Sequence, residues 1–392
     1  MLENKKIAIV ANSTWNIYNF RQDLIRMFKA ESCKVIVIAP IDEYIHYLNG
    51  SYFTNHIPLH HLNSQSQSPL EEWRCFWELY HIYRKEKPDI ILHFTIKPNL
   101  YGSIAARFLK IPCVSTITGL GFSFLKREKL STFFTLLYRF ALRKNKRVLF
   151  HNDEDNLLFQ KLNITSNTQG KVVPGSGVNT NYFHPSFNEI NKDKFCFLFA
   201  GRLLKDKGLE EFIQASIQCR AFLKRAEFWV VGQLNEENPN TISKTDLLDW
   251  VEKRYIKYLG AEKDIRPIIA QCNVLVLPSY REGKPKSLLE AMSMAKPVIT
   301  TDVAGCRDLV EHEINGLIVP PKDGFSLAEA MVRLYNMSDA EVNKMGLSGR
   351  SLVEDHFSIA KVLDCYRNIV TEILIHSNQD NSSVGIKENI NK

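Results

Sequence analysis

Two carboxylates, Glu282 and Glu290, stand eight positions apart around a point where a polar loop runs into a helix. The start of a helix offers free backbone amides and the positive end of its dipole to an anion. Carboxylates beside an anion site are unexpected unless they bind hydroxyl groups. A diphosphate at the helix start would supply the anion. A sugar on one side of it and a ribose on the other would supply the hydroxyl groups. The alternative is an ordinary loop glutamate and a solvated helix glutamate.

The elements that must position these carboxylates form a strand–loop–helix–strand unit. Val274–Leu277 is a short apolar run, right for a buried parallel strand and too short for a helix. Pro285 suits the first helical position, because its missing N–H would be unpaired there. A second buried strand is expected at Pro297–Thr300. The amides of Ser287 and Leu288 at the helix start are therefore candidates for contact with a diphosphate.

Two cations follow another apolar strand, Phe195–Ala200, in the stretch that begins with Gly201. Arg202 offers a bidentate fork to phosphate and Lys207 offers a point charge. Because ligands of α/β sheets bind beyond the carboxyl ends of the strands, both cations are expected at a ligand site. The alternative is a solvated pair of cations. Gly305 follows the strand expected at Pro297–Thr300. It either lines the same ligand site or serves only a tight turn.

The pattern from Glu282 to Met292, EGKPKSLLEAM, resembles the E-x7-E signature of retaining glycosyltransferases of the GT-B fold, in the large family 4 group. This resemblance implies a UDP-sugar donor carrying a hexose or N-acetylhexosamine. Glu290 would hold the ribose hydroxyls and Glu282 the sugar hydroxyls, with Gly283 beside them. Arg202 and Lys207 would neutralise the leaving diphosphate, so that neither a metal nor another cofactor is expected.

The chain is long enough for two domains, since 392 residues exceed one ordinary core. Alternating strand and helix patterns indicate an α/β class. With the resemblance, we expect two Rossmann-like doubly wound domains and a cleft between them. The expected boundaries are 1–185 for an acceptor-side domain and 186–356 for a donor-binding domain. By resemblance, 357–375 crosses back onto the first domain, and 376–392, poor in apolar residues, is expected to be disordered.

The first domain carries two stretches, HFTIKPNLYGS and TITGLGFSF, that resemble a subgroup extending lipid-linked saccharides, including undecaprenyl-diphosphate sugars. Lys97 would contact the acceptor or its phosphate, although a surface loop lysine is an equal alternative. Thr118, Gly119 and Gly121 would bring backbone close to the sugars. Many relatives have glycines in the first loop, whereas this chain has NSTWN, which ends at Asn16. We therefore expect that loop on the acceptor side, with Asn16 or the preceding tryptophan meeting a sugar.

The segment after the first strand predicts one amphipathic helix. Ile17, Phe20, Leu24 and Phe28 would mark its apolar face, and Arg21 would lie on the opposite face. The turn before this helix carries no G-x-G-x-x-G, so a dinucleotide fingerprint is absent.

Composition favours a cytoplasmic protein. The eight cysteines show no C-x2-C spacing, which fits a reducing compartment without a disulfide framework. The opening residues, MLENKKIAIVAN, have too few apolar positions for a signal peptide, and no apolar run approaches the length of a transmembrane helix. We expect at most a peripheral attachment to the inner face of the cytoplasmic membrane.

The net charge of +7 is concentrated in Phe122–Arg147, where eight Lys or Arg residues face one acidic residue, Glu128. Large apolar side chains are interleaved with these cations. Such a face can lie on an anionic membrane surface. A core helix with solvated lysines is about as good an interpretation. Nucleic acid ranks last, because no nucleic-acid-binding module is recognisable.

Three functions remain open. The first is a transferase that moves a sugar to a lipid-diphosphate-linked saccharide during assembly of a surface polysaccharide or glycan. The second is another enzyme of this fold, either a transferase with a soluble acceptor or a sugar-nucleotide epimerase. The third is a catalytically silent sugar-nucleotide-binding partner. The presence of Arg202, Lys207, Glu282 and Glu290 argues against silence.

Overall fold

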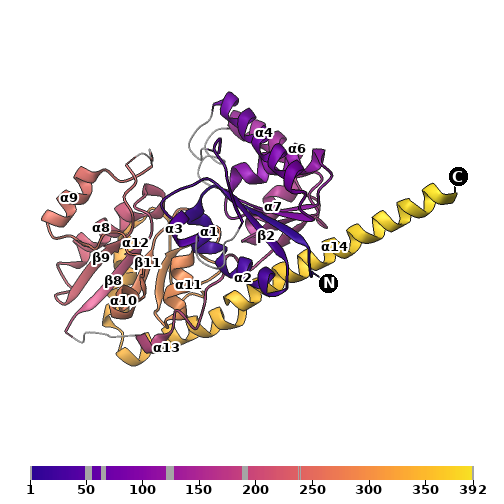
Figure 1. Cartoon of the computed structure of the whole chain (residues 1–392). Coiled ribbons are helices and arrows are strands. Elements are labelled where there is room, and N and C mark those ends of the chain that lie inside the picture. The colour runs from indigo at the N-terminus through magenta and orange to yellow at the C-terminus, as the bar shows by residue number, and fades with distance from the viewer. Residues whose placement is uncertain are drawn as a thin grey trace. The chain divides into compact units, whose positions relative to one another are not determined.

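The computed structural model describes residues 2–48, 55–62, 68–120, 128–187, 193–236, 238 and 240–390. The chain divides into two compact units (Figure 1). Unit 1 comprises Met1–Ser176 and Lys361–Lys392, and unit 2 comprises Gly177–Ala360. The chain passes from one unit to the other at Ser176–Gly177 and again at Ala360–Lys361, and the boundaries at 185 and 356 stay predictions.

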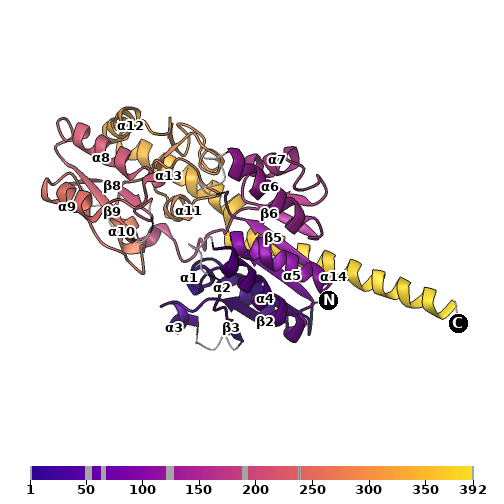
Figure 2. The ribbon, with the colours of Figure 1, turned by 90° about the horizontal axis from the view of Figure 1, so that it is seen from above.

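Unit 1 is a parallel sheet between helices (Figures 1 and 2). Its strands are β1 (Lys6–Val10), β2 (Lys34–Ala39), β3 (His56–Pro58), β4 (Ile90–Phe94), β5 (Cys113–Ile117), β6 (Arg147–Phe150) and β7 (Gly170–Val172). Its helices are α1 (Thr14–Phe20), α2 (Gln22–Ala30), α3 (Ile45–Leu48), α4 (Pro69–Glu86), the π-helix η1 (Pro98–Gly102), α5 (Ser103–Phe108), α6 (Glu128–Leu142), α7 (Asp153–Lys161) and most of α14 (Ile359–Ile390). The strand order is β3-β2-β1-β4-β5-β6-β7. The order therefore reverses direction between β1 and β4, which is where such sheets place a ligand crevice.

Unit 2 repeats this architecture with a parallel sheet in the order β10-β9-β8-β11-β12-β13. Its strands are β8 (Phe195–Ala200), β9 (Ala226–Val231), β10 (Lys257–Tyr258), β11 (Val274–Leu277), β12 (Val298–Thr301) and β13 (Gly316–Val319). Its helices are η3 (Pro185–Phe187), η4 (Lys205–Lys207), α8 (Leu209–Cys219), α9 (Lys244–Glu252), α10 (Arg266–Gln271), α11 (Lys286–Ser293), α12 (Gly324–Asn336), α13 (Asp339–Leu352) and η5 (Val353–Phe357). The predicted α/β class with two Rossmann-like sheets is confirmed.

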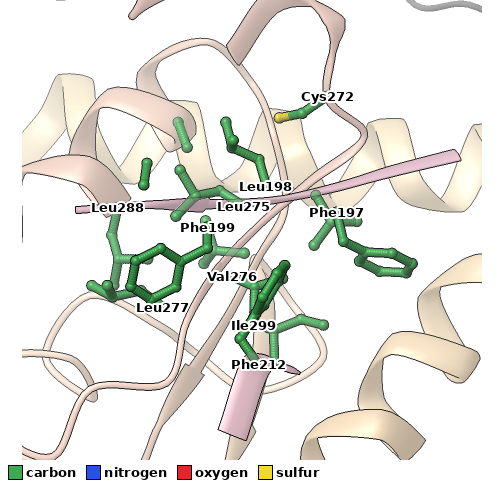
Figure 3. Close-up of a cluster of buried hydrophobic side chains, with 14 of the residues drawn as sticks. Phe197, Leu198, Phe199, Phe212, Cys272, Leu275, Val276, Leu277, Leu288 and Ile299 are labelled. Atoms are coloured by element: carbon green, nitrogen blue, oxygen red, sulfur yellow. The ribbon is translucent and has the colours of Figure 1, made fainter. Parts of the chain in front are cut away.

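The core of unit 2 lies where β8, β11 and β12 meet the helices beside them. Figure 3 shows Phe197 and Phe199 of β8, Leu275 of β11 and Ile299 of β12 in one cluster with Leu288 of α11. All five side chains are fully buried. Strands covered on both faces read as continuous apolar runs rather than alternating ones, which is why these strands are visible in the sequence.

The prediction of a single helix after β1 is wrong. It breaks into α1 and α2 at Arg21, whose backbone lies outside the helical region at φ −125° and ψ −3°. The break changes the helical phase, so Arg21 turns inward and is 2% exposed. Its guanidinium lies 3.8 Å from the centre of the Phe94 ring, a cation–π contact. Burial lowers the pKa of Arg21 to about 10.

From Lys361 onward, α14 belongs to unit 1 and packs on its sheet. The buried Tyr366 hydroxyl hydrogen-bonds the Thr116 hydroxyl of β5 at 3.0 Å. Arg367 pairs with Glu31, and Arg147 of β6 pairs with Glu372.

The sequence predicts that this helix ends at Ile375 and that 376–392 is disordered. The helix is longer than predicted, because the bounds of α14 extend to Ile390, and the disorder of 376–392 stays a prediction. Low apolar content indicates a segment that does not pack, but nothing in its composition forbids helix: the stretch 376–390 contains no proline and a single glycine.

Removing the Tyr366 hydroxyl is expected to loosen α14. Tyr366→Phe takes the buried Thr116 hydroxyl's partner away and should lower the free energy of opening of α14 amides by about 1 kcal/mol, measured by hydrogen exchange. Tyr182→Phe is the control, because that ring is exposed in unit 2. Unchanged protection of α14 in Tyr366→Phe would show that the hydroxyl contact contributes nothing.

Candidate active site

The predicted donor-side residues of unit 2 follow three adjacent strands at one edge of the sheet. Gly201 and Arg202 come directly after β8, Glu282 follows β11, and Gly305 follows β12. Because the strands are parallel, their carboxyl ends lie at the same edge. The structure therefore brings together residues that are far apart along the chain.

An ion pair between Lys207 and Glu282 lies at the centre of this edge. The side chains are only 17% and 11% exposed, which shields the pair from solvent screening. The hydroxyl of Ser279 donates a hydrogen bond of 2.7 Å to the same Glu282 oxygen. The sequence analysis did not single out Ser279, although its place directly after β11 is a usable signal. Together Lys207 and Ser279 fix the orientation of the carboxylate.

Close backbone contacts hold the loops of this ion pair together. The Tyr280 amide donates to the Asp206 carbonyl at 2.9 Å, and the Glu282 amide donates to the Ala304 carbonyl at 3.3 Å. Gly305 adopts φ +80°, and a Cβ atom there would lie 2.5 Å from the Glu282 carbonyl oxygen and also collide with the carbonyl of Gly283. Gly305 is thus required for a close approach as well as for a turn.

Helix α11 begins beside this ion pair. Its N-cap is Pro285, one position before the predicted place at the first helical residue, and a proline side chain cannot cap the first amides. Gly283 is buried and Ser287 is half-buried, whereas the Leu288 side chain packs into the core. The helix start thus combines amides with no capping side chain and the positive end of the dipole.

Glu290 lies one turn further along α11 and is 9% exposed. Burial raises the pKa of its carboxyl group, and the Lys286 ammonium at 3.5 Å offsets this only in part. A buried carboxylate that one ion pair compensates only in part lowers the stability of the fold. Glu290 is therefore not a solvated helix glutamate.

Two further cations near the edge differ in their environment. Arg202 is exposed and makes no ion pair with any residue in the described ranges. Lys284, one position beyond Gly283, is 7% exposed at its side chain and lies 3.6 Å from Asp308. Its ammonium also sits 5.2 Å from the centre of the Phe357 ring. Arg202 is therefore available to an anion, while Lys284 is occupied within the fold.

The predicted acceptor-side residues of unit 1 also follow adjacent strands, β1, β4 and β5. Asn16 lies in the first turn of α1, and its buried side-chain oxygen has no partner among the described residues. Thr118 and Gly119 follow β5, with Gly119 at φ +140°. Lys97 is 15% exposed and pairs with Glu72 at 2.5 Å, so its ammonium has a partner within unit 1.

Gly121 and the first part of the predicted membrane segment, 122–127, lie outside the described residues. Within the described ranges, no cluster of three or more His, Cys, Asp or Glu side chains has the arrangement of a metal site. No described helix is both long enough and apolar enough to span a membrane.

Comparison with known proteins agrees with this architecture. Residues 194–337 match the model of the family described as glycosyl transferases group 1, and residues 6–152 match that of the glycosyl transferase 4-like family. The fold resembles a glycosyltransferase from Rickettsia africae with a TM-score of 0.77 at 18% identity, over 95% of this chain and 99% of that one. Anabaena HepE in complex with UDP and glucose gives a TM-score of 0.76 at 17% identity, over 94% of this chain and 100% of that one.

Two curated relatives are similar over most of their length. The N,N'-diacetylbacillosaminyl-diphospho-undecaprenol alpha-1,3-N-acetylgalactosaminyltransferase of Campylobacter jejuni is 26% identical over 86% of this chain and 91% of its own. The UDP-Gal:alpha-D-GlcNAc-diphosphoundecaprenol alpha-1,3-galactosyltransferase of Escherichia coli is 28% identical over 79% of this chain and 82% of its own.

The paired parallel sheets and these matches define the class: the chain is a glycosyltransferase of the GT-B fold. Within that class, unit 2 carries the match to the group 1 family and unit 1 carries the match to the 4-like family. The predicted enzyme class is therefore confirmed.

The close approach at Gly305 can be tested against a glycine with the same backbone angle. Gly305→Ala should lower the melting temperature of unit 2 more than Gly260→Ala does. Both positions have φ near +80°, but a Cβ at Gly260 meets no atom within 4 Å. Gly260→Ala should therefore lose only the roughly 1–2 kcal/mol of left-handed strain, and scanning calorimetry compares the two. An equal fall in melting temperature in the two variants would mean that the Glu282 loop moves aside for the added Cβ atom at little cost.

Proposed function

We propose that this enzyme is a retaining transferase that moves a sugar from a UDP-sugar to a lipid-diphosphate-linked saccharide. The observation that carries the proposal is the half-buried Lys207–Glu282 pair, next to a helix start without a capping side chain. The Anabaena relative was solved with UDP and glucose, which supports the donor class. The names of the two bacterial relatives support a saccharide on undecaprenyl diphosphate as the acceptor. The product would enter a surface polysaccharide or glycan at the inner face of the cytoplasmic membrane.

In this proposal the donor lies along the carboxyl edge of the unit 2 sheet. Glu282, held by Ser279 and Lys207, accepts hydrogen bonds from the sugar hydroxyls. Lys207 and Arg202 stabilise the charge that develops on the leaving diphosphate, together with the amides at the start of α11. Glu290 accepts from the ribose hydroxyls, and this contact compensates its burial. Two protein cations then supply the charge that a divalent metal provides elsewhere.

Retention would follow from attack on the same face from which the diphosphate leaves, with a leaving-group oxygen taking the acceptor proton. A double displacement needs a free carboxylate nucleophile. Glu282 is already bound by an ammonium and a hydroxyl, which makes it a poor nucleophile. Asn16, Thr118 and Gly119 would meet the acceptor sugars in unit 1, and Lys97 would act near the acceptor phosphate.

The competing functions are separated by one assay. UDP release from a panel of UDP-sugars is measured with a lipid-diphosphate saccharide, with a soluble saccharide and with no acceptor. We expect release that depends on the lipid-diphosphate acceptor. Release with the soluble saccharide alone favours the second candidate, and interconversion of the donor without UDP release favours an epimerase. Donor binding without turnover of any donor would identify a silent partner and sink the proposal.

Substitution of the central ion pair should abolish most transfer. Lys207→Ala and Glu282→Gln are each expected to lower kcat/KM by about 100-fold or more, because each removes a group that acts on developing charge or on the sugar. Lys205→Ala is the matched control, since Lys205 is exposed two positions away and its only described acidic neighbour is Glu210 at 3.9 Å. Wild-type rates in either site variant, with folding checked by circular dichroism, would refute these roles.

Glu290 offers a test in which stability and affinity move in opposite directions. Because burial raises its pKa, the carboxyl group stabilises the fold while protonated. That contribution is complete below the unfolded pKa and is lost as pH rises through the folded pKa. Glu290→Gln should therefore raise the melting temperature more at about pH 7.5 than at about pH 4.5, and weaken UDP binding by about tenfold.

Glu329→Gln is the control for both readouts, because Glu329 is exposed on α12. Calorimetry measures the melting temperatures and titration calorimetry the affinity. An equal change in melting temperature at the two pH values, with unchanged UDP affinity, would remove Glu290 from the donor site.

A further inference from the structure

Two helices of unit 1 carry apolar stripes on their exposed sides. On α4 the stripe is Leu70, Trp73 and Trp77, which are 55%, 60% and 37% exposed. On α6 it is Phe133, Leu136 and Phe140, which are 60%, 54% and 49% exposed. Both stripes have the i, i+3, i+7 spacing that places side chains on one helical face.

These outer stripes are not needed for packing, because each helix already buries a second apolar face. Cys75, Leu79 and Tyr83 of α4 are buried in the core, as are Tyr138 and Leu142 of α6. Amphipathic helices normally turn charged and polar residues to water. Helices that are apolar on both sides indicate a partner on the outer side.

The two stripes belong to one continuous surface, because α4 packs on α5 and α5 packs on α6. Phe108 of α5, 65% exposed, bridges α4 and α6: its ring lies 6.1 Å from that of Phe76 on α4. Arg107, next to it, lies over the Phe140 ring at 4.9 Å.

The surface is hollowed at two places over α4. A groove of about 780 Å³ is lined by Trp73, Trp77, Ile57 and Ile82, with His60 and His81 among its other residues. A smaller one of about 290 Å³ runs between Trp73, Phe76 and Phe108. Most of the surface that lines both grooves is apolar. This apolar lining suits hydrocarbon chains.

Exposed charges around this surface are mainly positive. Arg74, Lys110, Arg143 and Lys144 are exposed on or beside the three helices. Three of the four acidic groups of α4 are engaged elsewhere: Glu72 pairs with Lys97, Glu86 pairs with Lys6, and Glu78 accepts from two loop amides. The fourth, Glu71, is half-buried and makes no ion pair with any residue in the described ranges. Cations around exposed tryptophan and phenylalanine fit anionic headgroups over an apolar layer. The same charges oppose contact between two copies of this face.

We infer that the outer side of α4, α5 and α6 docks on an anionic lipid bilayer, with Trp73, Trp77 and Phe108 as its central anchors. This rests on the proposed function, in which the acceptor is lipid-linked. It overlaps the predicted segment Phe122–Arg147 at α6, and it extends beyond that segment to α4 and α5. In that segment Tyr138 is buried, Arg139 donates to backbone carbonyls of Leu162 and Asn163, and Arg147 pairs with Glu372. The central anchors Trp73, Trp77 and Phe108 lie outside that segment, and the grooves over α4 receive lipid chains.

The test uses the full chain and vesicles of phosphatidylglycerol and phosphatidylethanolamine. Trp73→Ser with Trp77→Ser, and separately Phe108→Ser with Phe140→Ser, should each weaken vesicle binding by about tenfold or more. Phe222→Ser is the matched control, since Phe222 is 78% exposed in unit 2. In the wild type, brominated lipids should quench tryptophan fluorescence, and Trp73→Phe with Trp77→Phe should remove most of that quenching.

Two further readouts separate this inference from the proposed function. Transfer to a short-chain, water-soluble diphosphate acceptor should be unchanged in all variants, whereas transfer to the full-length lipid acceptor in vesicles should fall. Vesicle binding that is unaffected by the substitutions overturns the docking face even if transfer is observed. Loss of a dimer on gel filtration in the same variants would assign the face to a second copy and also overturn it. Absence of transfer with normal vesicle binding would refute the proposed function alone.

Discussion

The ammonium of Lys207 and the carboxylate of Glu282 meet in a largely buried place that neither loop could build alone. Two backbone approaches set the separation of the loops. At Gly208, φ is +74° and a Cβ atom would collide with the Pro278 carbonyl, and at Gly305 it would collide with the loop of Glu282. Any side chain at either glycine would separate the charges. The start of α11 is one short turn from this pair, so its orientation toward a donor depends on the same contacts.

The two units position their candidate site residues in the same way, at the carboxyl edge of a parallel sheet. In each, chemically useful residues follow three neighbouring strands in the middle of a parallel sheet, β1, β4 and β5 in unit 1 and β8, β11 and β12 in unit 2. Strands fully buried on both faces make the edge rigid, while the loops beyond it carry the polar groups. Glu290 is buried in α11, which follows β11, and the buried oxygen of Asn16, which has no partner among the described residues, lies in α1, which follows β1.

Much of the fold could be predicted because parallel strands leave a simple signal. The bounds of β8 and β11 agree with the sequence prediction, since each is a continuous apolar run. The helices α7 and α9 and the strand β13 were not predicted. The two helices are mostly polar, with small apolar faces, and β13 has four residues. Arg21 was placed on the wrong face because a break in a helix cannot be seen from periodicity.

In the candidate site, features that lie close together in the sequence could be predicted, whereas contacts between distant residues could not. The spacing of Glu282 and Glu290 within one loop and helix is local, and the sequence alone places them near a helix start. The contact between Lys207 and Glu282 joins residues 75 positions apart and depends on strand order, which no pattern in the sequence specifies. The apolar stripe of α4 is a stronger case, because Trp73 and Trp77 look like core residues until Cys75, Leu79 and Tyr83 are seen to fill the inner face. An exposed apolar residue indicates a partner only when the structure shows which other residues of its helix fill the core, so the stripe of α4 could not be assigned to a docking face from the sequence.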